Sequence, residues 1–492
     1  MGPVGAAQST IATLALLTAS AVCAAGQDVA STSASSLDRR PLAELVQELP
    51  GQVASLDDLV RVALERNLPL EATRLRRRLA EAGVDVEGGD FDLGFTLGAD
   101  VTRNRQFSDR GGTYRAGLSQ VLPWGTALGL DLSGRRSPGS SYDADVGLAL
   151  SQPILEGFRT RDTDFRVARL LSEASVHRLG RANAAIVADV ELAYWDLAEA
   201  EAIQAVLQRS HEIAEALLFR NQALAERQLV AEVDVITARS GVALRRSTLI
   251  SARRARVDAA EATVFLVWGE GAGQELARDT LPLKTLPVEV SIPEVPPYPD
   301  AEAMALGRRR DLAAARSELR GAEVAAESSR NARLPFFSLD GLVRRGGTDS
   351  SLGSSLGAIN QGWSWSLGLS FAQPLGNRRD RGIDQIAQLT RELRRLDLML
   401  IENIVRQDVR EAVRAIVAGG ERFEAGAEAA ALASEQLEAE RRRLDLGLGD
   451  SFRLLETEEN AVQAELASVR ARYDLARAVT RYRLAIGRTV GR

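Results

Sequence analysis

The chain has 492 residues, of which 26% are charged and 5% are aromatic, and its formal net charge is −6. This slightly acidic balance provides no basic surface for nucleic acid, so we expect no nucleic-acid partner. Two histidines, His177 and His211, and one cysteine, Cys23, are too few for a disulfide or for a metal site built from these residue types. We therefore expect no metal ion, no cofactor and no catalytic cysteine in the mature protein.

Residues 1–25 are expected to be a secretory signal peptide, because Ile11–Ala25 is an apolar run of small residues that is too short to span a bilayer. The first residues lack the Lys or Arg that such a signal usually carries. Lipidation of Cys23 is the alternative, although the residues before it fit a lipoprotein cleavage site poorly. Residues 26–54 follow as an N-terminal tether. No later segment is apolar for long enough to cross a membrane as a helix, so a crossing would have to use strands.

The first structural repeat is expected to cover residues 55–270. Helical periodicity runs from about Leu56 to Gly88, and alternating apolar and polar residues then predict four strands. From about Thr163 to Gly269 there is no proline, and apolar residues recur at spacings of three and four. This pattern predicts a long helix pair packed as a coiled coil. The seam of its first helix is formed by Ile186, Val190, Ala193, Leu197, Ala200, Gln204 and Leu207.

A proline-rich connector, residues 271–300, separates this repeat from a second one, residues 301–492. The connector holds six of the 15 prolines and cannot be a continuous helix. The second repeat shows the same order of patterns as the first. A helix from Ala301 to Ala332 precedes two strands, and a long helix pair begins near Arg381.

The most informative stretch of the second repeat is Gly362–Pro374, GWSWSLGLSFAQP. Alternate residues are large and apolar, and the residues between them are small or polar. With two tryptophans near one end, this pattern is typical of a strand that has lipid on one face and water on the other. We expect the lipid-facing side chains to be Trp363, Trp365, Leu367, Leu369 and Phe371.

Part of this stretch occurs twice, because Gly368–Pro374 (GLSFAQP) matches Gly147–Pro153 (GLALSQP), which indicates an internal duplication. Long helix pairs and a few amphipathic strands cannot bury their faces within one chain, and open strand edges are costly in lipid. Ring closure between copies would remove those edges. The patterns thus predict a homo-oligomeric tube, partly a strand barrel in a membrane and partly a helix barrel in water. A soluble coiled-coil scaffold with a β-cap is the alternative.

Over nearly all of Leu56–Gly491 the chain resembles the TolC-like outer membrane efflux proteins. The most specific matches are two strand-to-helix joints, Gln152-Pro153 and Gln373-Pro374, the helix-to-strand joint Asn331–Pro335 and the turn Leu446–Ser451. The resemblance implies a homotrimer in which each chain gives four strands to a twelve-stranded transmembrane β-barrel. The implied fold class is mainly α with β, internally duplicated, with the long coiled-coil helix pairs forming a periplasmic α-barrel.

The resemblance also implies a function, that of a passive outer-membrane channel or duct of a tripartite efflux or type I secretion system, and not that of an enzyme. The implied partners are a periplasmic adaptor (membrane fusion) protein, an inner-membrane transporter and outer-membrane lipid. The chain contains no G-x-x-x-x-G-K-[ST] loop, so the energy would come from the transporter. The sequence does not specify whether the cargo is a drug, a metal ion or a protein.

In the family, the turns of the helix pairs form the periplasmic end of the tunnel, where the adaptor docks. Glycines in the second turn would permit a positive φ and close approach of another backbone, or they simply end a helix. Gln228 stands where the family has a glycine, and a left-handed backbone there would cost on the order of 1 kcal/mol. The implied docking tips are Gln228, Leu229, Val230, Ala231 and Glu232 in the first repeat, and Leu446, Gly447, Leu448, Gly449, Asp450 and Ser451 in the second.

The resemblance further implies a tunnel gate near the tips, with Asp234, Arg453 and Glu456 as candidate residues. Leu444 and Gly449 occupy the positions of a tyrosine and an arginine that lock the closed state in the family, so that lock is expected to be absent. We hypothesise that an Asp234–Arg453 pair replaces it. The alternative is that these charges lie on a solvated helix face, where ion pairs are worth about 0–1 kcal/mol.

One predicted hairpin departs from the family pattern. The stretch Tyr114–Leu132 raises the number of strand-like pieces to six per chain, where the family barrel uses four. The sequence does not place this hairpin. An addition outside the hydrocarbon layer, either extracellular or equatorial, is the expectation.

Overall fold

The described part of the protein, seen in a computed structural model, comprises residues 53–104, 109–136, 141–228, 230–268, 284–285, 296–359, 362–446 and 448–488. The expected signal peptide, nearly all of the tether and most of the proline-rich connector lie outside these residues. The chain divides into two units, Met1–Ala54 and Ser55–Arg492. Of the first unit only strand β1 (Val53–Ala54) is described, so the account below concerns the second unit.

Two helices, α3 (Leu56–Arg66) and α4 (Leu68–Gly88), open the second unit, and the 3-10 helix η1 (Gly89–Phe91) follows them. Each of the two helices begins at a polar side chain that accepts a hydrogen bond from a backbone N–H three residues further on. Ser55 caps α3 in this way and Asn67 caps α4. The predicted helix from Leu56 to Gly88 is therefore two helices, separated at Asn67.

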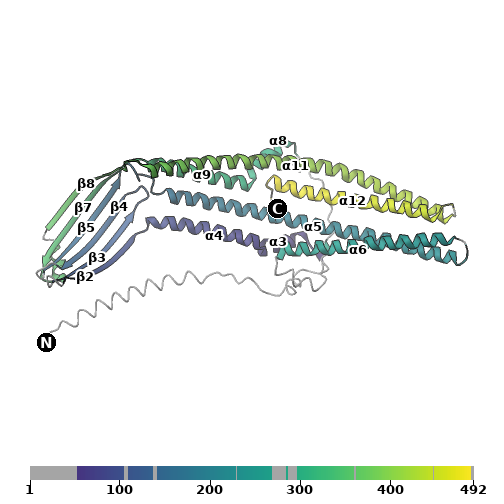
Figure 1. The fold of residues 1–492 in the computed structure, drawn as a ribbon, viewed down its shortest axis with the longest axis horizontal. Coiled ribbons are helices and arrows are strands. Elements are labelled where there is room, and N and C mark those ends of the chain that lie inside the picture. The colour runs from purple at the N-terminus through teal and green to yellow at the C-terminus, as the bar shows by residue number, and fades with distance from the viewer. Residues whose placement is uncertain are drawn as a thin grey trace, which may run out of the picture. The chain divides into compact units, whose positions relative to one another are not determined.

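The predicted long helix pairs are present in both repeats. In the first, α5 (Thr163–Ala225) has 63 residues and is followed by α6 (Glu232–Trp268). In the second, α11 (Arg378–Asp445) has 68 residues and is followed by α12 (Ser451–Ala485). Figure 1 shows the two members of each pair running side by side. At 1.5 Å per residue, α5 alone extends over about 95 Å.

The second repeat opens with α8 (Tyr298–Arg308) and α9 (Arg310–Asn331), after the two-residue strand β6 (Lys284–Thr285). Along the chain, the short helix α10 (Leu352–Gly357) comes between the two strands of the second repeat. Both repeats thus run from two helices through strands to a long helix pair, which confirms the predicted duplication.

Six strands form one antiparallel sheet in the order β2-β3-β4-β5-β7-β8. Figure 1 shows this sheet at one end of the second unit and the turns of the helix pairs at the other. Strands β5 and β7 belong to different repeats, and their pairing joins the repeats into one sheet. The strands are β2 (Gly94–Asn104), β3 (Asp109–Val121), β4 (Ala127–Arg136), β5 (Tyr142–Pro153), β7 (Phe336–Asp349) and β8 (Gly362–Ala372).

Strands β3 and β4 are the extra hairpin, and the structure places them inside the sheet, between β2 and β5. The sequence did not place this hairpin, and the expectation that it lies outside the hydrocarbon layer stays a prediction, but the hairpin is an integral part of the sheet. Pairing on both sides satisfies the backbone N–H and C=O groups of both strands, which an appended hairpin would leave partly open. Each chain accordingly contributes six strands to the sheet rather than the four implied by the resemblance.

The hydrophobic core lies between the helices, and it includes Ile186, Val190 and Leu197 of the predicted coiled-coil seam. Val190 and Leu197 on α5 are fully buried. Further along α5, Val206 packs against Val462 and Leu466 of α12, so the helix pairs of the two repeats share one core there. Within the described residues no helix is both long enough and apolar enough to cross a membrane.

Candidate functional site

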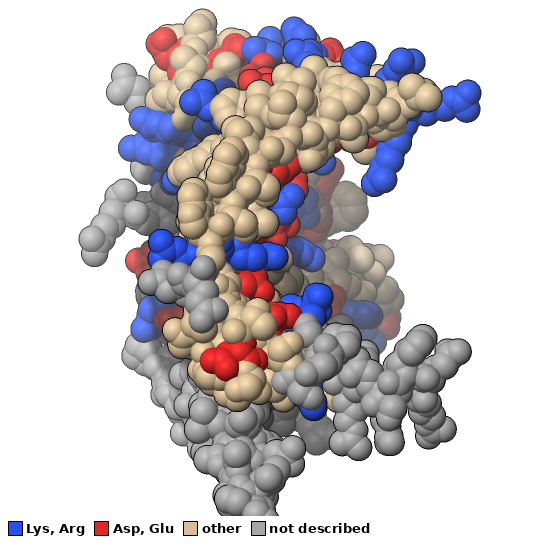
Figure 2. Space-filling view, turned by 90° about the vertical axis from the view of Figure 1, so that its left-hand side faces the viewer, with Lys and Arg blue, Asp and Glu red and all other residues tan. Residues whose placement is uncertain are grey.

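One face of the sheet is apolar across all six strands. The strand register places six large apolar residues in one row, with one residue from each strand. Their side chains are 38–67% exposed, which is unusual for a contiguous set of large apolar residues. Figure 2, which views the sheet end, shows a broad area of surface without charged side chains. The row consists of Phe95, Leu118, Leu130, Leu148, Val343 and Trp365.

The five side chains predicted to face lipid lie on this apolar face, all on β8, and each is 65–68% exposed. They are neighbours of apolar residues on β7 in the same register, such as Val343 opposite Trp365 and Leu339 opposite Leu369. The Trp-bearing strand is therefore one edge of a larger apolar face that includes every strand of the sheet.

The opposite face of the sheet is small and polar. The next row of the register holds Thr96, Gly117, Asp131, Gly147, Arg344 and Ser364. On this face Nε of Arg344 lies 2.9 Å from Oδ1 of Asp145, and Nη2 of Arg344 lies 3.8 Å from Oδ2 of Asp131. A Cβ atom at Gly147 would lie 2.7 Å from Oδ1 of Asp131, so the glycine leaves room for this carboxylate.

Hydroxyl groups surround another carboxylate on the polar face. Asp340 of β7 accepts hydrogen bonds from Ser151 of β5 at 2.6 Å, from Ser338 at 3.0 Å and from Ser370 of β8 at 2.8 Å. These bonds connect three neighbouring strands. A sheet with one apolar and one hydrogen-bonding, charged face can separate an apolar medium from water.

The structure brings together two of the joints that carry the family resemblance. Oδ1 of Asn331, in the helix-to-strand joint, accepts a hydrogen bond from the backbone N–H of Gly157 at 2.8 Å. The Nδ2 group of the same side chain donates to the carbonyl of Leu155 at 3.0 Å. These residues directly follow the Gln152-Pro153 joint. The asparagine of the second repeat thus fixes the path by which the first repeat leaves the sheet.

At the first helix tip the backbone of Gln228 is left-handed, with φ at +57°. A residue with a side chain adopts this conformation less readily than glycine does. After the turn, a carboxylate oxygen of Asp234 accepts a hydrogen bond from the backbone N–H of Ala231 at 3.3 Å, close to the start of α6. Val230 lies in the same turn, Glu232 is the first residue of α6, and Leu229 lies outside the described residues.

At the second tip, Asp450 caps α12 by accepting a hydrogen bond from the backbone N–H of Arg453 at 2.7 Å. The backbone N–H of Leu448 returns to the carbonyl of Arg443 at 2.8 Å. A Cβ at Gly449 would lie 3.2 Å from the backbone nitrogen of Leu444, so this position favours a glycine for close packing. Leu446 directly follows α11 and Ser451 begins α12, while Gly447 lies outside the described residues.

The hypothesised Asp234–Arg453 pair is not formed within the chain. Nε of Arg453 instead lies 3.8 Å from Oε1 of Glu440, a buried residue of its own helix pair. Asp234 lies in the first turn of α6, in the other helix pair. Glu456, the third gate candidate, is exposed on α12. The three candidates are therefore near the tips, but the structure does not join them to one another.

Sequence reasoning missed a buried polar cluster between the two helix pairs. Arg245 of α6 is 6% exposed and Glu458 of α12 is 1% exposed, and Nη2 of the arginine lies 3.2 Å from Oε2 of the glutamate. Nε of Arg245 donates to Oγ of Ser210 on α5 at 3.0 Å. Burial raises the pKa of Glu458, although the charge of Arg245 opposes this shift. A usable signal was present, because Arg245 lies seven residues from the buried Ala238 and from Ala252, at a seam position.

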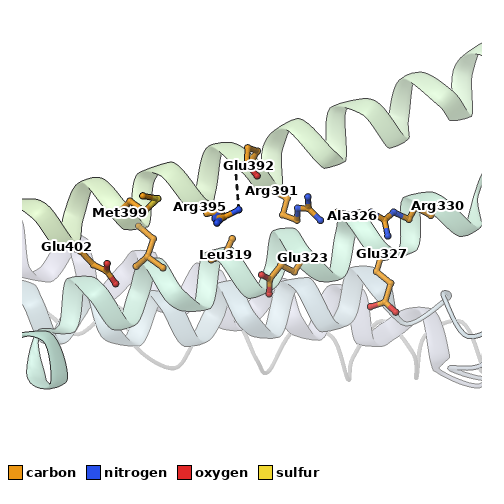
Figure 3. Close-up of a pocket in the computed structure, with 11 residues that line it drawn as sticks. Leu319, Glu323, Ala326, Glu327, Arg330, Arg391, Glu392, Arg395, Met399 and Glu402 are labelled. Atoms are coloured by element: carbon orange, nitrogen blue, oxygen red, sulfur yellow. Dashed lines mark ion pairs between the residues drawn. The ribbon is translucent and has the colours of Figure 1, made fainter.

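An open groove of about 790 Å³ runs between α9 and α11 (Figure 3). Both helices contribute acidic and basic side chains to it, and one pair, Glu392 and Arg395, approaches to 3.9 Å. The groove is not enclosed and holds no converging set of polar groups that would suggest catalysis. Within the described residues, no group of three or more His, Cys, Asp or Glu could hold a metal ion. The lining comprises Leu319, Glu323, Ala326, Glu327, Arg330, Arg391, Glu392, Arg395, Leu398, Met399 and Glu402.

Solved structures share this fold. The chain is similar to the outer-membrane channel OprN, with 20% identity and a TM-score of 0.66 over 88% of this chain and 89% of that chain. It is also similar to the CmeC outer membrane channel of Campylobacter jejuni, with 17% identity and a TM-score of 0.66 over 88% and 85% of the two chains. A third similar structure is the open state of the MtrE outer membrane channel of Neisseria gonorrhoeae, with 19% identity and a TM-score of 0.64 over 89% of this chain and 90% of that chain. At these identities the likeness shows the fold alone.

No protein with curated annotation matches the sequence. A family model, described as outer membrane efflux protein, matches residues 59–270 and 303–488. These two segments cover most of both repeats, with the proline-rich connector between them. The chain therefore belongs to the outer membrane efflux protein family, whose fold and location are those of outer-membrane channels.

Proposed function

We propose that the protein is the passive outer-membrane duct of a tripartite export system. The observation that carries the proposal is the sheet, which has one exposed apolar face and one charged, hydroxyl-rich face across six strands. Membership of the efflux family supports the same function and does not favour the soluble coiled-coil scaffold. In this proposal the sheet stands in lipid, the long helix pairs extend into the periplasm, and the chain itself catalyses no reaction.

The duct is proposed to be a homotrimer in which the sheets of neighbouring copies pair edge to edge. Strands β2 and β8 form the two edges of the sheet, and both have 11 residues. Six antiparallel strands leave the two edges running in opposite directions, so β8 of one copy can pair antiparallel with β2 of the next. This pairing would satisfy backbone groups that cost several kcal/mol each when left open in lipid.

We further propose that the two helix tips bind the periplasmic adaptor, through the residues named above, and that an inner-membrane transporter supplies the energy. The left-handed Gln228 and the tightly packed Gly449 support tips with defined backbone shapes. Asp234, Arg453 and Glu456 remain the proposed gate residues, because their side chains lie close to these tips. The two repeats, 55–270 and 301–492, are proposed as the structural domains.

The test of the duct is a charge placed on each face of β8. Leu367→Arg puts a charge on the apolar face, and a charge on the lipid face of a membrane strand costs about 2–4 kcal/mol near the bilayer centre. We expect this variant to disappear from the outer-membrane fraction as a heat-modifiable oligomer. The control, Ser366→Arg, puts the same charge on the polar face and should be recovered like the parent. Equal recovery of both variants, or a detergent-independent single chain, would refute the duct.

A further inference from the structure

The hairpin of β3 and β4 is built into both faces of the sheet. On the apolar side, Leu118 of β3 stands opposite Phe95 of β2, and Leu130 of β4 stands opposite Leu148 of β5. On the polar side, Arg115 of β3 lies 3.6 Å from Asp100 of β2. The hairpin thus continues the same division between apolar and polar faces as the strands on either side of it.

Strand β4 also carries polar partners for β5 and β7. Oγ of Ser133 donates to Oδ2 of Asp145 on β5 at 2.7 Å, and Asp131 pairs with Arg344 of β7. Between Tyr114 and Ser133, the charged residues of the hairpin, Arg115 and Asp131, both lie on the polar face. The matching of charges across β4, β5 and β7 indicates that these strands share one polar environment.

The turn of the hairpin is fixed to the strand-to-helix joint. The backbone N–H of Arg159, just before α5, donates to the carbonyl of Trp124 in the turn at 3.2 Å. The hydroxyl of Thr126 donates to Oε1 of Gln152, the glutamine of the family motif. Gly125 has a φ of +98°, and a Cβ there would lie 2.6 Å from the carbonyl oxygen of Gly157. The turn between β3 and β4 therefore lies beside the strand-to-helix joint that follows β5.

Both strands of the hairpin are also long enough to cross a membrane. β3 has 13 residues and β4 has 10 residues, and a tilted transmembrane strand needs about 9–11. Together with the fixed turn at one end, this length gives the hairpin the same span as β2, with 11 residues, and β5, with 12 residues.

We propose that this hairpin is part of the membrane wall, so that a ring of three copies contains eighteen strands. The inference rests on the proposed homotrimeric duct. Because the diameter of a closed ring of strands grows roughly in proportion to their number, the lumen is about one and a half times as wide as with four strands per copy. The strand region then passes bulkier cargo than a twelve-stranded ring would.

The test uses two matched pairs of cysteine variants, each with one position on either face of a strand. Leu118→Cys and Ser119→Cys lie on β3, and Leu367→Cys and Ser366→Cys lie on β8. Each variant of the full chain is labelled with an environment-sensitive fluorophore and reconstituted into vesicles of brominated phosphatidylcholine. The parent chain, whose only cysteine is Cys23, measures background labelling.

We expect the bromine atoms to quench the labels at both leucine positions severalfold more than the labels at both serine positions. If Leu367→Cys is quenched and Leu118→Cys behaves like Ser119→Cys, the hairpin lies outside the lipid and the inference is overturned. If neither leucine position is quenched, the duct itself fails. Imaging the parent oligomer in lipid gives a second measurement that needs no variant, because a ring of eighteen strands supports the inference and one of twelve contradicts it.

Discussion

Gln228 carries the left-handed backbone conformation of the first helix tip, and a side chain in this conformation costs about 1–2 kcal/mol. Gln228→Gly should therefore stabilise the tip. The greater freedom of glycine in the unfolded chain offsets part of the gain, so we expect a net effect of up to about 1 kcal/mol. Amide hydrogen exchange of the turn between α5 and α6 would measure it as slower opening.

Asn377, just before α11, provides the control for this prediction. Its φ is +42°, but asparagine tolerates the left-handed region better than glutamine does. Its Nδ2 group also donates to the carbonyl of Arg333 at 3.2 Å. Asn377→Gly should consequently bring no gain. Faster exchange at the tip in Gln228→Gly would show that the glutamine side chain stabilises the turn in another way.

Glu191 of α5 is a second residue whose environment predicts a measurable effect. It is 2% exposed, and its Oε1 atom has no hydrogen-bond partner within the described residues. Burial raises the pKa of this carboxyl, more than Thr480 and Arg483 lower it. A raised pKa in the folded state means that stability is highest while the group is protonated, below its unfolded pKa of about 4.3, and declines as the pH rises through the folded pKa.

Glu191→Gln removes this charge, so the variant should be more stable than the parent at pH 8, by about 1 kcal/mol. At pH 4 the carboxyl is largely protonated in both states, so the advantage should disappear. Thermal unfolding of the two proteins in detergent at several pH values measures the difference. A gain that is the same at pH 4 and pH 8 would mean that the charge of Glu191 is not its source.

The buried pair of Arg245 and Glu458 connects elements of the two repeats, α6 with α12, and Ser210 adds α5. Removing one partner leaves the other charge buried without compensation, which typically costs 3–5 kcal/mol. Arg245→Ala should therefore lower the stability of the helix pairs by about that amount. Thermal unfolding followed by far-UV circular dichroism measures the loss.

The double variant Arg245→Met, Glu458→Met separates charge from packing. It fills a similar volume without a charge, and replacing a buried ion pair in this way is often neutral or stabilising. We expect it to recover most of the stability that Arg245→Ala loses. An equal loss in the single and double variants would assign the effect to packing between the three helices.

The elements that the sequence predicted are those defined by a local period. The seam of α5 was recognisable because apolar residues recur at spacings of three and four, and Val190 and Leu197 are indeed buried. The Trp-bearing strand was recognisable because its alternation is strict over 11 residues. Both patterns depend only on the geometry of one helix or one strand, so neighbouring elements are not needed to read them.

The position of the extra hairpin and the partner of Arg245 could not be predicted, because both depend on residues far away in the sequence. The alternation of apolar and polar residues in β3 and β4 predicts that each strand has an apolar and a polar face. It does not predict which strands lie next to β3 and β4. Glu458 stands beside the partly exposed Glu459, and only the packing of α12 against α6 buries one and not the other. The same limit applied to Arg453, whose neighbour is Glu440 rather than the expected Asp234.

At the scale of the molecule, the two edges of the sheet are continued by exposed helix faces. The helices lie in the order α4, α5, α9 and α11, as adjacent pairs, so α4 and α11 are the outer ones of this group. On α11 five large apolar residues recur at spacings of three and four and are 55–67% exposed. This is the pattern of a coiled-coil seam without its partner helix. The five residues are Ile386, Leu389, Leu393, Leu396 and Leu400.

Exposed apolar residues on α4 complement this seam. Leu75, Leu79 and Val86 are 50–72% exposed, although α4 packs against α5 on its other side. A second copy of the chain would cover both surfaces at once, with α11 and β8 of one copy against α4 and β2 of the next. Such a head-to-tail contact closes into a ring when the rotation between copies permits it.

The double variant Leu393→Glu, Leu400→Glu should therefore prevent assembly without unfolding the chain. Each side chain is more than half exposed in the single chain, so the folded monomer loses little packing. In the ring, however, the new carboxylates would be buried between helices without a partner, which is strongly unfavourable. Light scattering in detergent should show a trimer for the parent and a monomer for the variant, with unchanged helical circular dichroism.

The control is Arg395→Glu, which changes the charge of the same helix by a similar amount on the side that faces the groove. This variant should leave the trimer intact. A trimer that survives in the double variant would exclude this face of α11 from the contact between copies.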